Sequence, residues 1–303
     1  MVEWLKRDLV GYGGRPPKVA WPGAARLALN FVLNYEEGSE ASFAQGDGYS
    51  ETNLIEVAHS PVPRGERDRG AESMFEYGSR AGFWRILRLF QERRLTLTVF
   101  ACAQALEVNA PAARAIADAG YDLCGHGWRW AEHFRLPEHE ERRQIAAAVA
   151  SLQRTIGRRP HGWYCRYAPS LDTRRLLAEE GGFLYDSDSY NDDLPYWTRI
   201  DGRPWLVIPY GLVNNDMRFV RGDFSTGGDF FGFVRDAIDL LRQEGRLAPK
   251  MLSVGLHNRL IGHPARAAGL QRLLDYVAGL DDVWVCQRLE IARHWQTQHP
   301  CPS

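Results

Sequence analysis

The sequence has few cysteines, no excess of positive charge and no long apolar run. Its five cysteines are an odd number and form no Cys-x-x-Cys motif, which argues against a disulfide framework and against a zinc knuckle. Lys plus Arg total 37 and Asp plus Glu total 38, so there is no basic excess to neutralise phosphates, and we expect no nucleic acid partner. Because no stretch approaches the roughly 18 apolar residues of a membrane-spanning helix, we expect no membrane partner either.

Phosphate-binding and targeting motifs are also missing. Nothing matches G-x-G-x-x-G or G-x-x-x-x-G-K-[ST], which argues against nucleotide binding. The first eight residues carry charges where a secretory signal needs its apolar stretch, and together with the cysteine usage this predicts a cytoplasmic protein. No repeat, low-complexity tract or linker divides the chain, so we expect residues 1–303 to form a single domain.

The residues that are present predict a large α/β fold. Short β-branched runs alternate with amphipathic stretches: residues 26–34 and 95–100 predict strands, and the apolar spacing over 83–90 predicts a helix between them. Pro137 opens a further helix that Gly157 ends. Continued alternation predicts a parallel (β/α) barrel of about seven or eight strands, with a doubly wound open sheet as the alternative. The polar stretch from about residue 37 to 73 lacks periodicity and predicts a lid, an oligomer contact or a disordered loop.

Polar side chains stand at the carboxyl ends of the predicted strands, which is where β/α barrels build active sites. Two histidines, a carboxylate pair and arginines would suit general acid–base hydrolysis there. Adjacent residues of a strand point to opposite faces, so we expect Glu36 or Glu37, but not both, to face inward, the other being solvated. Asp192 and Asp193 precede Leu194-Pro195 and are typical of a turn. The strand-end segments are 34–37, 126–130, Arg166, 186–188 and 257–259.

These segments carry a family resemblance. Asn34-Tyr-Glu36, His126-Gly-Trp-Arg-Trp130, Arg166 to Pro169 and Gly255-Leu-His257 follow the motif order of the polysaccharide deacetylases, which have a distorted β/α barrel. Longer stretches resemble a narrower branch, the metal-independent bacterial allantoinases: 33–38, 76–82, 179–188, 192–197, 215–219, 249–257, 259–262, 264–266 and 291–295. The resemblance covers nearly the whole chain. It implies a hydrolase that opens the cyclic amide of a hydantoin-like ureide, allantoin to allantoate in purine catabolism being the first candidate.

The resemblance also changes the expected metal chemistry. Metal-dependent deacetylases surround one divalent ion with an Asp base, a second Asp and an H-x-x-x-H pair. Asn34 stands at the base position, Glu36 at the ligand Asp, His126 at the first His and Trp130 at the second. Glu36 and His126 alone would hold an ion weakly, because catalytic zinc usually has three protein ligands, and His133 would help only if its loop folded back. We therefore expect no required cofactor.

Without a metal, side chains must supply the chemistry. The resemblance implies Glu36 as the base, His126 as the group that positions the water or shares its proton, and His257 as the general acid. Burial in an aromatic mouth is expected to raise the pKa of Glu36. Arg166 and backbone N–H groups are the expected donors to the oxyanion. The residues expected to contact substrate are Asn34, Tyr35, Trp130, Trp163, Cys165, Arg166 and Asn258.

Two departures from the branch leave the substrate open. The fourth strand reads Gly-Trp-Tyr-Cys165-Arg166, where the branch has Gly-Trp-Tyr-Thr-Gly-Arg, and Asn258 stands where a Cys is familiar. A cyclic imide, or another amide or acetyl substrate, is therefore an alternative to a ureide, and Cys165 is an alternative nucleophile. A non-catalytic, ureide-binding barrel is the remaining alternative. Segment 38–72, the aromatic content and the oligomeric nature of similar allantoinases predict a homo-oligomer, a dimer or tetramer.

Overall fold

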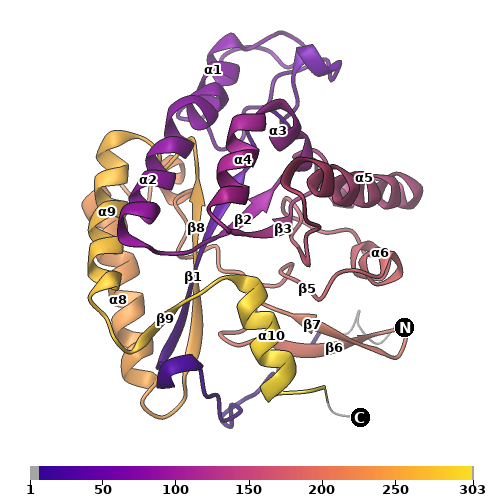
Figure 1. Cartoon of the computed structure of the whole chain (residues 1–303). Coiled ribbons are helices and arrows are strands. Elements are labelled where there is room, and N and C mark those ends of the chain that lie inside the picture. Colours follow the sequence, from indigo (N-terminus) through magenta and orange to yellow (C-terminus); the bar gives the residue numbers. More distant parts are fainter. Residues whose placement is uncertain (1–6, 302–303) are drawn as a thin grey trace.

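The computed structural model describes residues 7–301 and contains one curved, mostly parallel sheet with helices around its outside (Figure 1). The strand order is β6-β7-β5-β4-β3-β2-β1-β8, and β9 also pairs with β1. This confirms the predicted α/β fold of the distorted-barrel type, with the sheet forming a half-barrel. The strands are β1 (Leu27–Tyr35), β2 (Thr98–Ala101), β3 (Asp122–Gly125), β4 (Gly162–Trp163), β5 (Tyr185–Asp186), β6 (Tyr196–Ile200), β7 (Arg203–Val207), β8 (Lys250–His257) and β9 (Val283–Val285).

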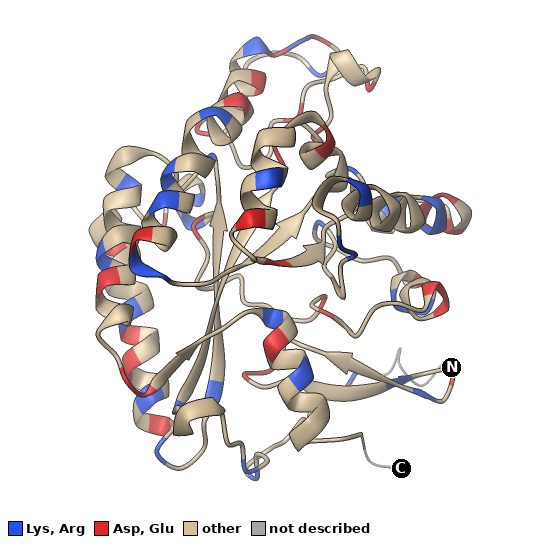
Figure 2. Ribbon diagram, in the orientation of Figure 1, with Lys and Arg blue, Asp and Glu red and all other residues tan. Residues whose placement is uncertain are grey.

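The helices cover the outer face of this sheet, and α8 and α9 lie side by side (Figure 1). Acidic and basic residues are interspersed along them (Figure 2). None of the helices within residues 7–301 is long and apolar enough to cross a membrane. They are α1 (Arg69–Tyr77), α2 (Phe83–Arg93), α3 (Ala103–Val108), α4 (Ala110–Asp118), α5 (Glu138–Ile156), α6 (Thr173–Glu180), α7 (Arg218–Arg221), α8 (Gly227–Glu244), α9 (Pro264–Ala278) and α10 (Arg288–Gln298).

Strand β1 pairs with strands from both the first and the last third of the chain. All nine of its residues are buried, as expected of a parallel strand covered on both faces. It pairs with β8 along its length, with β2 at its carboxyl end and with β9 at its amino end. The register sets Asn34 opposite His257, so two of the predicted site segments end side by side. That residues 1–303 form one domain stays a prediction.

The half-barrel is closed at its carboxyl end by a loop and not by strand pairing along its length. The antiparallel pair β6–β7 forms one edge and β8 the other. Residues 214–216 cross the gap: the Gly255 N–H donates to the Asn214 carbonyl oxygen at 2.9 Å, and the Asp216 N–H donates to the Gly255 carbonyl oxygen at 3.0 Å. This loop therefore brings Asp216 to the end of β8.

Two glycines let the turn after β8 pack against the π-helix η4 (Gly78–Gly82). A Cβ on Gly82 would lie 2.0 Å from the Asn258 carbonyl oxygen, and one on Gly262 would lie 2.1 Å from the same atom. Real side chains cannot approach a backbone oxygen so closely, so glycine is required at both positions. This contact fixes the turn that follows His257.

The aperiodic stretch forms a roof above the carboxyl ends of the strands. Apart from the 3₁₀ turn η3 (Phe43–Gln45), it has no helix before Arg69. Ser39, Glu51 and Ile55 are buried, so the part of the segment up to residue 55 is packed against the rest of the protein, whereas residues 56–70 include no buried residue. Of the three readings that the sequence left open, the structure favours a cover over the site.

Candidate active site

Glu36, His126 and His257 come together at the carboxyl ends of β1, β3 and β8. Glu36 Oε1 lies 3.3 Å from His126 Nε2 and 3.7 Å from His257 Nε2. All three side chains are almost fully buried. The structure thus brings the three expected catalytic residues within reach of one another, and their roles stay predictions.

Glu36 is paired with an arginine for which no role was expected. Arg259 Nη1 lies 2.7 Å from Glu36 Oε2. Burial by itself would raise the pKa of Glu36, but Arg259, His257 and His126 outweigh burial and hold that pKa well below its usual range. The expectation of a raised pKa was wrong, because it considered burial without this buried cation.

Glu37 is buried as well, which corrects the expectation that it is solvated. Its Oε2 accepts a hydrogen bond from Asn258 Nδ2 at 2.8 Å, and its Oε1 accepts one from the Arg259 N–H at 3.2 Å. The alternation rule fails because β1 ends at Tyr35, so Glu36 and Glu37 lie in the turn beyond it. Glu37 therefore ties the turn after β8 to the end of β1.

The two histidines are oriented by different partners. His126 Nδ1 lies 2.8 Å from the Tyr164 carbonyl oxygen, which can only accept, so Nδ1 carries a proton and Nε2 faces Glu36. His257 Nδ1 lies 2.6 Å from Asp216 Oδ1. Burial would lower the pKa of His257, but the Asp216 and Glu36 carboxylates outweigh it and raise that pKa. The raised pKa suits His257 to donating a proton.

Asp216 is a site residue that the sequence reasoning missed. Besides binding the His257 ring, its Oδ2 accepts the N–H groups of His257 at 2.6 Å and Ile261 at 3.1 Å. The only signal was its place in the stretch 215–219, which carries the family resemblance. Its position depends on the loop that closes the half-barrel.

The three residues line a cavity of about 480 Å³. Of the expected substrate contacts, Asn34, Trp130 and Arg166 line it. Several tyrosines and asparagines also line it and were not expected. The full set is Asn34, Glu36, Asn53, Leu54, His126, Trp130, Glu132, Tyr164, Arg166, Tyr167, Tyr190, Tyr210, Leu212, Asn215, Met217, Arg221 and His257.

Four expected contacts lie behind the cavity wall, which corrects their assignment. Asn258 points to Glu37, and Tyr35 packs on Phe83 while its hydroxyl accepts from Asn109. Trp163 is fully buried, and its indole N–H lies 3.3 Å from Cys165 Sγ. Burial also raises the pKa of the Cys165 thiol. Neither its location nor its protonation state suits Cys165 as a nucleophile.

The two arginines of the cavity differ in their partners. Arg166 Nη1 lies 2.6 Å from Glu51 Oε2, and its guanidinium stacks 3.7 Å above the Trp130 ring. Arg221, at the end of α7, is exposed and makes no side-chain hydrogen bond or ion pair within residues 7–301. Arg221 is therefore free to bind an acceptor group of a ligand.

The residues at the family's metal position do not fit a divalent ion. Trp130 offers no ligand atom, and Asn34 donates its amide N–H to the Leu256 carbonyl oxygen at 3.1 Å. Glu36 and His126 remain, but one carboxylate oxygen of Glu36 is already bound to the Arg259 guanidinium. A second cation at this place would be repelled by the first.

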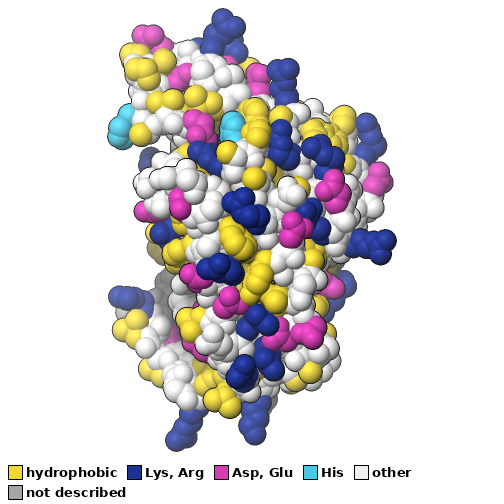
Figure 3. Space-filling view, turned by 90° about the vertical axis from the view of Figure 1, so that its left-hand side faces the viewer, with side chains coloured by type: hydrophobic (Ala, Val, Ile, Leu, Met, Phe, Trp, Pro, Cys, Tyr) yellow, Lys and Arg dark blue, Asp and Glu magenta, His cyan; other side chains and the backbone are white. Residues whose placement is uncertain are grey.

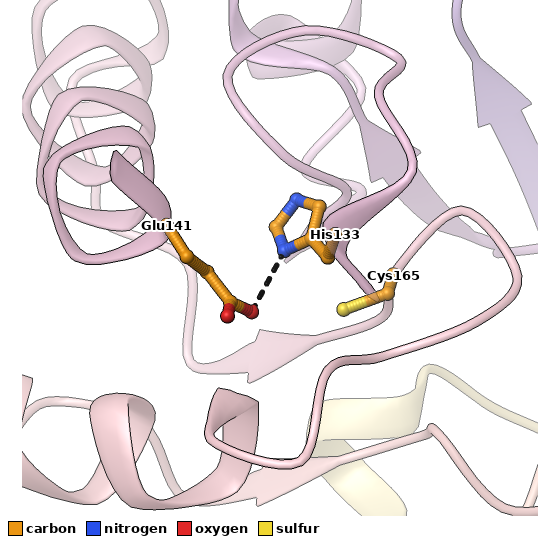
Figure 4. A group of neighbouring side chains, drawn as sticks. All are labelled: His133, Glu141 and Cys165. Carbon is orange, nitrogen blue, oxygen red and sulfur yellow. Dashed lines mark hydrogen bonds and ion pairs between the residues drawn. The ribbon is translucent and has the colours of Figure 1, made fainter. Parts of the chain in front are cut away.

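His133 belongs to a separate buried group with Glu141 and Cys165 (Figure 4). It is the one group of three prospective ligands within residues 7–301, with ligand atoms within 4.8 Å of one another. Glu141 already accepts from His133 Nδ1 at 3.2 Å and from the Ser170 and Thr173 hydroxyls at 2.5 Å each. These bonds tie the loop before α6 to α5, so His133 supports that loop and does not join Glu36.

Comparison with known proteins agrees with this architecture. The polysaccharide deacetylase family pattern matches residues 65–185. A putative polysaccharide deacetylase of Schizosaccharomyces pombe is 40% identical over 97% of this chain and 98% of its own length. The crystal structure of a probable polysaccharide deacetylase from Pseudomonas aeruginosa PAO1 is 49% identical, with a TM-score of 0.94, over 98% of this chain and 99% of that one.

A second solved structure is that of PuuE allantoinase. It is 50% identical to this chain, with a TM-score of 0.93, and the match covers 98% of this chain and 99% of that one. Identity at this level over nearly the whole of both chains shows common descent as well as a common fold. The chain belongs to the polysaccharide deacetylase family.

Proposed function

We propose that this protein is a hydrolase that opens the ring amide of a hydantoin-like ureide, with allantoin as the first candidate and purine breakdown as the setting. The observation that carries the proposal is the Glu36 carboxylate lying between His126 and His257, with Asp216 Oδ1 2.6 Å from His257 Nδ1. Together they offer a proton acceptor and a proton donor in one buried site. The likeness to PuuE allantoinase supports the choice of substrate.

In the proposed reaction, a water molecule attacks the ring carbonyl carbon. Its proton passes to the pair of Glu36 and His126, whose facing atoms are 3.3 Å apart. The C–N bond then breaks, and His257 Nε2 gives its proton to the leaving nitrogen. The products are a carboxylate and an amide N–H, so one water is consumed and the side chains return to their starting states after proton exchange with solvent.

The cavity supports a small substrate. Its volume of about 480 Å³ suits a molecule of ring size, and Asn53 and Leu54 of the roof form one wall. A polysaccharide would need an open groove. The neutral hydroxyl and amide groups of the lining match the uncharged N–H and C=O groups of a ureide.

Because residues 165–169 differ from the pattern of the allantoinase branch, cyclic imides are kept as an alternative class of substrate. Arg166 is bound to Glu51 and stacked on Trp130. It therefore narrows the cavity on this side without offering an unpaired charge. A flat imide such as succinimide would need fewer contacts than allantoin. The non-catalytic alternative requires that no substrate is turned over.

One assay separates these candidates. The purified protein is incubated with allantoin, hydantoin, succinimide and an N-acetylglucosamine oligomer, and ring opening or acetate release is measured, with the Glu36→Gln variant as the control for contaminating activity. Turnover of allantoin above the others supports the proposal. Preference for succinimide or acetate release overturns the substrate choice, and no turnover at all supports a binding protein.

The proposal includes a cytoplasmic, metal-independent homo-oligomer. Five free cysteines are in keeping with a reducing compartment. The face shown in Figure 3 carries hydrophobic side chains between charged ones. In α8, the side chains of Phe233 and Leu240 are exposed. Light scattering at micromolar concentration tests assembly: a 34.4 kDa particle would contradict it.

A further inference from the structure

We propose that Arg259 is a positioning residue whose guanidinium, in contact with the Trp130 and Phe75 rings, aligns the Glu36 carboxylate for proton transfer and supplies the fixed positive charge of a site without a metal. This inference rests on the proposed hydrolase function. It concerns a residue that the sequence reasoning left without a role.

The first argument is how Arg259 divides the Glu36 carboxylate. Its Nη1 binds Oε2 at 2.7 Å, which leaves Oε1 facing the two histidines. A carboxylate with one oxygen fixed in this way cannot rotate freely. Arg259 therefore determines which oxygen is presented to the reacting water.

The second argument is how firmly Arg259 itself is held. Its side chain is 1% exposed, and its Nε donates to the Leu54 carbonyl oxygen at 2.9 Å. Its Nη1 also lies 3.3 Å from Glu37 Oε1. A guanidinium fixed at three points and shielded from water acts on a carboxylate more strongly than an exposed one would.

The third argument is the identity of the aromatic rings. The guanidinium carbon lies 4.4 Å from the Phe75 ring centroid and 4.9 Å from that of Trp130, distances at which a ring face attracts a cation. Trp130 stands at the position of the second histidine in the H-x-x-x-H pair of metal-dependent deacetylases. The residue that removes a metal ligand thus provides a surface for an organic cation beside the same carboxylate.

Chemical rescue tests this role. Arg259→Ala should lower kcat for ring opening by about 10²-fold, with a smaller change in KM, because the substrate contacts stay in place. Guanidinium or methylguanidinium at millimolar concentration should then raise kcat at least tenfold in a saturable manner, whereas ammonium and Zn²⁺ should not. Circular dichroism before and after addition shows whether the variant is folded.

Arg266→Ala is the matched control. Arg266 also pairs with a glutamate, Glu56, and lies over an aromatic ring, Phe219, but it does not contact Glu36. Guanidinium should not raise its kcat. A folded Arg259→Ala protein that guanidinium fails to activate, or that Zn²⁺ activates instead, would overturn the inference.

Two further outcomes remain decisive. If Arg259→Ala does not fold, Arg259→Lys replaces it, because lysine keeps the positive charge but lacks the planar guanidinium group. The kcat of the folded Arg259→Lys protein should fall at least tenfold, and an unchanged kcat overturns the inference. If the wild-type protein opens no ring, the proposed function fails and this role falls with it, a result distinct from failed rescue of an active enzyme.

Discussion

Asp216 binds His257 through both of its carboxylate oxygens: Oδ1 of the aspartate lies 2.6 Å from Nδ1 of the histidine, and the other carboxylate oxygen accepts the His257 N–H. The pair comes from the loop that closes the half-barrel and from the end of β8. Because one carboxylate fixes both the ring and the backbone, it sets the direction of the Nε2 proton as well as the charge of the ring.

Asp216→Asn should move the alkaline limb of the kcat–pH profile to lower pH. The Asp216 charge raises the pKa of His257, so removing it lets the acid lose its proton at a lower pH. The profile is measured on the first substrate that the assay identifies. Asp223→Asn, an exposed aspartate beside Arg218, should leave the profile unchanged; an unmoved limb in Asp216→Asn would exclude His257 as the acid.

Glu36→Gln and His257→Asn should each reduce kcat by about 10²- to 10⁴-fold, the usual contribution of a positioned acid or base. The double variant should lose less than the product of the two factors, because both groups act in one proton-transfer sequence. Steady-state kinetics of the three variants decide this. Near-normal turnover of Glu36→Gln would remove Glu36 from the reaction.

Glu37→Gln should destabilise the protein. Both carboxylate oxygens accept N–H donors, so an amide NH₂ would meet Asn258 or Arg259 without an acceptor between them. The expected loss is about 1–3 kcal/mol in the free energy of unfolding. Denaturant titration measures it, and wild-type stability would mean that Glu37 does not hold the turn.

Activity should persist after exhaustive chelation, because the Glu36 carboxylate is bound to Arg259 and Trp130 supplies no ligand. The measurement is turnover before and after dialysis against a strong chelator, with the metal content of the dialysed protein determined in parallel. Loss of activity that only zinc or cobalt restores would refute a metal-independent reaction.

Arg221→Met should raise KM for allantoin several-fold and leave KM for unsubstituted hydantoin nearly unchanged. Arg221 is the cavity arginine without a partner in the part of the chain that the structure describes, so it is the residue free to bind the ureido arm that hydantoin lacks. Arg221→Lys should fall between the two. Equal changes in KM for both substrates would show that Arg221 does not bind the ureido arm of allantoin.

Local patterns predicted much of the fold. The largely apolar run of β1 and the start and stop of α5, at Pro137 and Gly157, depend on neighbouring residues alone, and Gly157 adopts the left-handed conformation that ends a helix. The meeting of Glu36, His126 and His257 followed from one general rule, that parallel strands end at the same edge.

The parts that were missed depend on contacts between distant segments. Arg259 and Asp216 gain their roles only through a turn and a loop whose courses no periodicity encodes. Cys165 and Trp163 were placed in the mouth because they end a strand, yet they face the core. A strand end locates a residue to within one position, and one position separates the cavity from the wall behind it.

The roof of residues 38–72 has a consequence for the size of the substrate. Arginines from three other segments bind it: Arg129 to Asp47 at 2.6 Å, Arg166 to Glu51 at 2.6 Å, and Arg259 to the Leu54 carbonyl oxygen at 2.9 Å. Lifting the roof would strip all three guanidiniums of these partners at once, and buried Arg259 has no water to replace its own. We therefore expect the roof to stay in place during turnover and to limit the size of the substrate. A ring of a few atoms would fit the cavity below it, whereas a sugar polymer would be excluded by its size alone.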